Sequence, residues 1–200
     1  MTKADPGDLL KQLPPAQAGK ARAPAPVHLW DPPYCGEIDI RIAADGRWYH
    51  EGSPIGRLAL VQLFSSILRL DDDGYHYLVT PVEKVRIKVD DCPFVAVLLD
   101  VEGHGEQQLL RFTLNTEEQV VAGADNIITV TTAADGQPHP LLHVRHGLNA
   151  LISRSVFYQL AAIATPDSAD DITANNDKNQ TKTNTLVVFS QGCKFSLGAI

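Results

Sequence analysis

The most regular pattern of apolar and polar positions lies in the first quarter of the chain. Isoleucines alternate with charged residues over positions 38–42, which is typical of a strand with one buried face. Asp45 and Gly46 then favour a turn, because glycine reaches positive φ without steric cost, and Trp48 begins a return strand. The pattern therefore predicts a β-hairpin.

A helix is predicted to follow this hairpin. Apolar residues recur at helical spacing from Leu60 to Ile67, so one face of the helix should be buried. Ser53 and Pro54 favour a helix start, because a serine hydroxyl accepts a hydrogen bond from a free helix N–H and proline fits the first helical position. The first unit is thus strand, turn, strand and helix.

A second unit of the same kind begins 90 residues later. Both turns have the sequence Ala-Ala-Asp-Gly, at 43–46 and 133–136, and a second helical pattern follows Gly147. We therefore expect an α+β fold of two similar β-β-α lobes from an internal duplication, with antiparallel sheets each packed by a helix. The alternative is that two unrelated hairpin-plus-helix segments look alike.

The composition changes along the chain and divides it into a leader and two lobes. We expect residues 1–33 to be a flexible leader with a short helix at 7–13, because its Pro/Ala tract builds no packed core. Residues 34–90 and 91–200 form the N-terminal and C-terminal α+β lobes. The polar stretch 165–185 nearly lacks aliphatic side chains and predicts a disordered insertion.

Whole-chain properties exclude few function classes. The 200 residues are 44% hydrophobic and 20% charged, as in an ordinary globular protein. A net charge of −7 disfavours binding to nucleic acid or to anionic membranes. The sequence shows no signal peptide and no run of roughly twenty apolar residues, so we expect a cytoplasmic protein. Cys35, Cys92 and Cys193 are far apart, which favours reduced thiols.

Three histidines raise the question of a metal site. His139, His143 and His146 lie within eight residues, but on a strand the first two share one face and the third points to the other. A closed site also needs acidic or thiolate partners, which this segment lacks. We therefore expect surface or interface histidines and no metal or other cofactor.

Catalytic motifs are equally weak. Ser53 follows Gly52 directly, whereas a nucleophile elbow has the pattern GxSxG. No cysteine has a histidine at a spacing known from thiol enzymes. We expect no enzymatic activity and assign no catalytic residue.

Basic and aromatic side chains lie beside the two repeats. Arg57, Arg145 and Arg154 carry guanidinium groups, which bind phosphate or carboxylate bidentately. Trp48 and Tyr77 offer faces on which a base can stack. Because pockets favour the seam between lobes, we expect these five residues to bind a ligand there. The alternative is that the arginines pair with surface carboxylates.

Five segments carry a specific resemblance in combination: CGEIDIRIAADGRWYHEGSPIGR, LVQLFSSILR, YLVTPVEKVRI, VRHGLNALISRSVFYQL and FSQGCKFSLG. Together they span most of residues 34–200 and resemble the uncharacterised bacterial family called domain of unknown function 1285. The resemblance implies an α+β fold with an internal duplication and a C-terminal half similar to a pleckstrin-homology domain. It also implies a site for a nucleotide-like ligand at the domain interface and a role in signal transduction. It supplies no catalytic residue.

Two functions from different classes follow. The first is a small-ligand-binding module in signal transduction, with its site between the lobes. The second is a protein-interaction adaptor that uses an exposed sheet edge or the leader and takes no small ligand. An open polar cleft would favour the first function, and a tightly filled apolar interface would favour the second.

Overall fold

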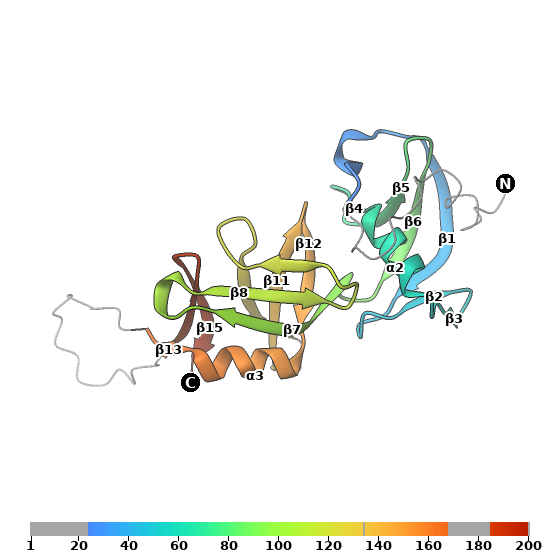
Figure 1. Cartoon of the computed structure of the whole chain (residues 1–200). Helices are drawn as coiled ribbons and strands as arrows, with labels where there is room; N and C mark the ends of the chain where they lie inside the picture. The colour runs from blue at the N-terminus through green and yellow to red at the C-terminus, as the bar shows by residue number, and fades with distance from the viewer. Residues whose placement is uncertain (1–23, 134, 168–184, 200) are drawn as a thin grey trace, which may run out of the picture. The chain divides into compact units, whose positions relative to one another are not determined.

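The computed structural model describes residues 24–133, 135–167 and 185–199 (Figure 1). The predicted helix at 7–13, most of the Pro/Ala tract and most of the predicted insertion at 165–185 lie outside the described residues. None of the described helices is long and apolar enough to cross a membrane.

The structure is mostly β-sheet. Strands hold 49% of the described residues and helices 16%, with two α-helices among them. The strands form two six-stranded sheets and one three-stranded sheet. The predicted α+β fold of two β-β-α lobes is therefore wrong, because most segments between the two repeats pair as strands.

The first sheet is built from the N-terminal part of the chain. In spatial order its strands are β3 (Ser53–Pro54), β2 (Trp48–His50), β1 (Tyr34–Ile42), β6 (Lys84–Val89), β5 (His76–Val79) and β4 (Leu68–Leu70). The predicted hairpin is confirmed, since Ile42 of β1 pairs with Trp48 of β2 across the turn at Gly46. However, β1 pairs with β6 in parallel, so the sheet is mixed and not antiparallel.

Helix α2 (Leu58–Ser66) starts later than the sequence predicts. Glu51 and Gly52 both have positive φ, as a two-residue type I′ turn requires, and this turn folds Ser53 and Pro54 back onto β2. The predicted helix start at Ser53 is therefore wrong: this residue belongs to β3. Arg57 is the N-cap instead, and its side chain makes no capping hydrogen bond.

The second sheet contains the predicted second repeat. Its spatial order is β10 (Ile128–Thr132), β11 (Pro138–Arg145), β12 (Leu148–Ile152), β7 (Phe94–Glu102), β8 (Leu109–Leu114) and β9 (Gln119–Val121). The predicted helix directly after Gly147 is wrong, because alternate residues of β12 are buried, the period of a strand. Helix α3 (Arg154–Ile163) begins only after this strand.

The strand order also argues against two similar lobes. Each of the two predicted repeats, called a copy here, contains three strands and then a helix along the sequence. In the first copy the first strand, β1, lies inside its sheet beside β6, whereas in the second copy the third strand, β12, lies inside beside β7. Similar order along the chain thus gives different positions within the sheets.

A third sheet closes the chain. It consists of β13 (Thr165–Pro166), β14 (Thr185–Ser190) and β15 (Cys193–Ala199). Strands β14 and β15 form a closing hairpin, with its turn at Gln191 and Gly192. The buried Ser190 hydroxyl donates to the Ala122 carbonyl and accepts from the Leu110 N–H, which ties β14 to the β8 strand. Two short 3₁₀ helices, η1 (Val27–Leu29) and η2 (Gly105–Gln107), complete the fold.

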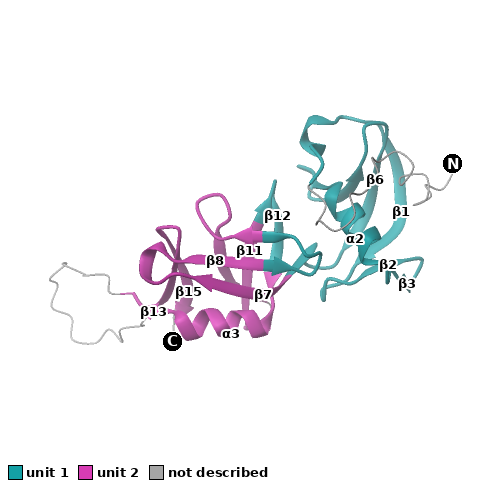
Figure 2. Ribbon diagram, viewed as in Figure 1, with its two compact units in different colours: residues 1–95, 113–119, 144–150 teal, residues 96–112, 120–143, 151–200 magenta. Residues whose placement is uncertain are grey.

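The chain divides into two compact units (Figure 2). Unit 1 holds the described residues up to Val95 together with 113–119 and 144–150. Unit 2 holds residues 96–112 and 120–143 and the described residues from Leu151 onward. The turn after β8 and the turn after β11 therefore belong to the same unit as the first sheet and α2.

Candidate functional site

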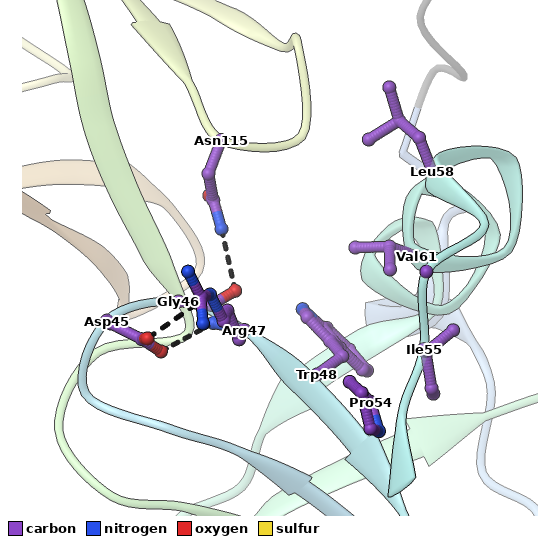
Figure 3. Close-up of a pocket in the computed structure, with 10 residues that line it drawn as sticks. Asp45, Gly46, Arg47, Trp48, Pro54, Ile55, Leu58, Val61 and Asn115 are labelled. Carbon is purple, nitrogen blue, oxygen red and sulfur yellow. Dashed lines mark hydrogen bonds and ion pairs between the residues drawn. The ribbon is translucent and has the colours of Figure 1, made fainter.

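Unit 1 contains a cavity of about 420 Å³ next to the first hairpin (Figure 3). It is lined by the β1–β2 turn, by residues 54–56, by Leu58 and Val61 of α2, and by Asn115. Small-molecule sites commonly have volumes of about 300–1,000 Å³ and mostly apolar walls with a few polar groups. The cavity has both properties, because prolyl and aliphatic side chains face polar groups of the turn.

Trp48 carries the most informative polar group of the cavity. Its side chain is 2% exposed, and its ring stacks on Phe64 with centroids 6.1 Å apart. The indole Nε1 is buried and has no hydrogen-bond partner among the described residues. In Figure 3 this nitrogen lies on the edge of the ring nearest the β1–β2 turn. A buried donor without an acceptor costs about 1–3 kcal/mol of folding free energy. Trp48, a residue of the cavity lining, holds such a donor.

Asn115 fixes the β1–β2 turn. Its Oδ1 accepts from the Val95 N–H at 3.0 Å, and its Nδ2 donates to the Gly46 carbonyl at 2.9 Å. A Cβ on Gly46 would lie 2.6 Å from Asn115 Nδ2 and 2.8 Å from a methyl group of Val95. Because Gly46 also has φ +80°, both its conformation and this close approach favour glycine.

The charged groups at the cavity are Asp45 and Arg47. Asp45 accepts a hydrogen bond from the Arg47 main-chain N–H at 3.0 Å, and its second carboxylate oxygen lies 3.4 Å from Arg47 Nε. The Arg47 side chain is 74% exposed, and exposed pairs of this kind contribute little to stability. The Arg47 guanidinium is thus accessible to a ligand.

The N-terminus of α2 also borders the cavity. Leu58 is the first residue of the helix and lines the cavity together with Gly56. The N–H groups of Leu60 and Val61 both donate to the Arg57 carbonyl, at 2.9 and 3.2 Å. Within the part of the chain that the structure describes, the N–H groups of Leu58 and Ala59 have no acceptor.

The five residues predicted to bind a ligand have different surroundings. Trp48 lines the cavity, and Arg57 lies between the two lining residues Gly56 and Leu58. Arg57 is exposed, and its side chain forms no hydrogen bond or ion pair with a described residue. Trp48 therefore lies in the wall of this cavity and Arg57 lies next to that wall in sequence, both within unit 1.

Arg145 and Tyr77 have internal partners elsewhere in unit 1. Arg145 binds both carboxylate oxygens of Glu118 and the Ser65 carbonyl, and its guanidinium lies 5.0 Å from the centre of the Phe94 ring. Tyr77 is buried, and its hydroxyl donates to Asp73 Oδ2 at 2.7 Å. Ligand binding by either residue stays a prediction.

Arg154 belongs to unit 2. It is the exposed first residue of α3, and it lines a separate cavity of about 460 Å³ with His139, Phe157 and Tyr158. Among the described residues it has no ion-pair partner. Its role in binding a ligand is a prediction that concerns this second cavity.

The three predicted surface histidines have separate surroundings. A ring nitrogen of His143 lies 2.8 Å from the Asp125 carbonyl oxygen. His146 stacks on His28, with ring centroids 4.6 Å apart, and has positive φ at the β11–β12 turn. The geometry therefore gives His143 and His146 different contacts.

Sequence reasoning missed Asn115 and the open end of α2. Asn115 is 69 residues from Gly46, and no local pattern links the two. The α2 N-terminus was missed because Ser53 and Pro54 matched a helix start. The one available signal was the Glu51-Gly52 pair, which favours a turn.

Comparison with known proteins gives one consistent family. A model described as "Domain of unknown function (DUF1285), N-terminal domain" matches residues 25–92, and "Protein of unknown function (DUF1285), C-terminal domain" matches residues 93–197. A crystal structure of a DUF1285 family protein from Silicibacter pomeroyi DSS-3 is 44% identical and covers 92% of each chain, with a TM-score of 0.77.

A second solved structure, of a DUF1285 family protein from Shewanella baltica OS155, is 25% identical. It covers 62% of this chain and 90% of its own, with a TM-score of 0.49. No curated protein matches the chain.

Proposed function

The chain belongs to the DUF1285 family, whose two domains have no known function, and we propose that it is a small-ligand-binding module that acts in signal transduction. We place the ligand in the cavity of unit 1 beside Trp48. The proposal rests chiefly on Trp48, a residue of the cavity lining whose buried indole N–H has no acceptor among the described residues. A bound ligand that offers an acceptor would satisfy this group.

The cavity defines two parts of such a ligand. An acceptor atom should meet the Trp48 N–H, and a flat or apolar part should pack against Ile55, Leu58 and Val61. A nucleotide-like molecule has both parts, because its phosphate and its base offer acceptors and the base has apolar faces. The proposal includes no catalytic step, and the free thiols of the chain support a cytoplasmic location.

A thermal-shift screen of the full chain tests this proposal. Nucleotides, cyclic nucleotides and dinucleotide cofactors should be compared with unrelated metabolites and divalent metals. A ligand at about 100 times its dissociation constant adds about 2.7 kcal/mol, which raises Tm by several degrees. We expect a saturable shift with one compound class.

A matched pair of variants localises the site. Trp48→Phe keeps an aromatic ring but removes the donor, and should weaken binding about tenfold, the equivalent of about 1.4 kcal/mol. Trp30→Phe removes the other tryptophan and should leave the affinity unchanged. No shift with any compound would contradict the proposal, as would equal shifts in both variants.

The alternative function is a protein–protein interaction adaptor without a small ligand. It is supported by large apolar side chains on the surface of unit 2, where Leu98 is 59% and Tyr158 65% exposed. Exposed apolar groups of this size often mark interaction sites. A flat thermal-shift panel together with weakened partner capture by Leu98→Ser would favour the adaptor.

A further inference from the structure

The helix that borders the cavity begins without a cap. Arg57 is at the N-cap position, its side chain makes no capping hydrogen bond, and the first turn contains no acidic residue. The N–H groups of Leu58 and Ala59 have no acceptor among residues 24–133, 135–167 and 185–199. Free N–H groups at a helix start are normally satisfied by side chains, water or a ligand. Together with the helix dipole they favour a negative charge.

This helix start is open to the cavity. Gly56 and Leu58 both line it, and a Cβ on Gly56 would meet no atom of the described residues within 4 Å. A ligand can therefore approach the main chain closely at Gly56. Helix N-termini with this access are common sites for carboxylate and phosphate groups.

The second, independent observation is Trp48. Trp48 lines the same cavity, and its buried indole N–H has no acceptor among the described residues. The amide of Asn115 is already engaged with Val95 and Gly46, and the Asp45 carboxylate is engaged with Arg47. The Trp48 indole N–H and the N–H groups of Leu58 and Ala59 are thus donors without a described acceptor, and the 56% exposed Asp45 carboxylate is the acidic group of the lining.

Two arginines add positive charge to these donors. The Arg57 side chain is exposed and has no ion pair with a described residue, and the Arg47 side chain is 74% exposed and pairs with Asp45 at 3.4 Å. Arg47 lines the cavity and Arg57 lies between the lining residues Gly56 and Leu58, so two exposed arginines belong to this part of a chain whose net charge is −7. Guanidinium groups bind carboxylate and phosphate oxygens well.

We infer that the cavity binds an organic anion, with its carboxylate or phosphate group at the N-terminus of α2. The main-chain N–H groups of Leu58 and Ala59, the indole N–H of Trp48 and the side chain of Arg57 contact the oxyanion. The organic part of the ligand packs on Ile55 and Val61. This inference rests on the proposed function and adds the charge of the ligand and its orientation.

Matched pairs of compounds test the charge of the ligand. In full-length protein carrying Trp30→Phe, Trp48 is the one remaining tryptophan and reports binding by fluorescence. The probes are AMP against adenosine, benzoate against benzamide, and inorganic phosphate alone. We expect a saturable change with at least one anion, at an affinity at least tenfold higher than that of its neutral partner.

Variants then locate the anion. Arg57→Ala should weaken binding of the anion about tenfold and reduce its salt dependence. Arg111→Ala is the control, because it removes an arginine of unit 2 that pairs with Glu102 and lines neither cavity, and it should leave binding unchanged. The Arg57 side chain makes no described hydrogen bond or ion pair, so its loss should leave the fold intact, as circular dichroism can confirm.

The outcomes separate the two proposals. Equal affinity for the anionic and neutral members of each pair, with a change in Trp48 fluorescence, overturns the anion inference and leaves the ligand-binding function standing. Unchanged anion binding in Arg57→Ala also overturns the inference. Unchanged Trp48 fluorescence with every compound contradicts the proposed function itself.

Discussion

Arg145 holds the carboxylate of Glu118 with one guanidinium nitrogen, at 2.6 and 2.7 Å from its two oxygens. Its other terminal nitrogen donates to the Ser65 carbonyl at 3.0 Å, near the end of α2. Both charged side chains are mostly buried, with 13% and 23% exposure. The arginine therefore links the β8–β9 turn to the helix within unit 1.

Removing this arginine should destabilise the protein. Arg145→Ala leaves Glu118 and the Ser65 carbonyl without their donor, and we expect a loss of about 2 kcal/mol in the free energy of unfolding. Urea denaturation measures the loss. The control Arg154→Ala replaces an exposed arginine and should change the free energy of unfolding by less than about 0.5 kcal/mol. Unchanged stability with weakened ligand binding would instead support Arg145 as a ligand-binding residue.

Gly46 and Gly74 provide a matched test of the close approach at the β1–β2 turn. Both have φ +80°, but only Gly46 has neighbours within 4 Å of an added Cβ. Gly74→Ala should cost about 1 kcal/mol from its backbone conformation. Gly46→Ala should cost about 2–3 kcal/mol, because Asn115 is held by two hydrogen bonds and must move. If urea denaturation shows the same loss of unfolding free energy in both variants, the β1–β2 turn accommodates the added Cβ without strain.

The Tyr77 hydroxyl should lose its proton at a higher pH than an ordinary tyrosine. Its hydrogen bond to Asp73, with burial as a smaller cause, raises the pKa of Tyr77 to about 12. Folding favours the protonated phenol, so this stabilisation is complete below about pH 10 and is lost as pH rises to about 12. Absorbance titration of wild-type protein and Tyr77→Phe isolates this group. Asp73→Ala should return its pKa toward the ordinary value, and an unchanged pKa would contradict the assigned cause.

The three cysteines should differ in reactivity. Burial, together with the neighbouring Asp91, raises the pKa of Cys92 to about 12, whereas Cys35 is exposed. The thiolate is the reactive form, so native Cys92 should resist dithiobis(nitrobenzoate) while Cys35 reacts first. Cys35→Ser should remove the fastest phase and Cys92→Ser should leave it unchanged. Rapid labelling of Cys92 would show that its surroundings open readily.

Local chemistry predicted the first hairpin and part of the site. Alternating isoleucines and the glycine turn gave β1 and β2 correctly, and Trp48 was a candidate because its aromatic face can stack a base. Helix starts were predicted less well. Ser53 matched a capping residue, yet the turn at Glu51 and Gly52 fixed it in β3 before the helix could begin.

Contacts between residues far apart in sequence explain why the fold class and part of the site were not predicted. Leu148 and Leu151 fit a helical spacing, but β12 pairs with β7, and these two strands are far apart in sequence. Asn115 reaches Gly46 and Arg145 reaches Glu118 only after the sheets form. No local pattern marks such contacts, so the fold class was wrong although the hairpins β1–β2 and β10–β11 were right.

The most direct test of the ligand site follows the indole N–H of Trp48 itself. In ¹H–¹⁵N spectra the protein has two indole signals, from Trp30 and Trp48, and Trp48→Phe assigns them. A ligand identified by thermal shift should move the Trp48 indole signal and slow its exchange with water, and should leave that of Trp30 in place. An unmoved Trp48 signal at saturating ligand would contradict the assignment of the cavity as the binding site.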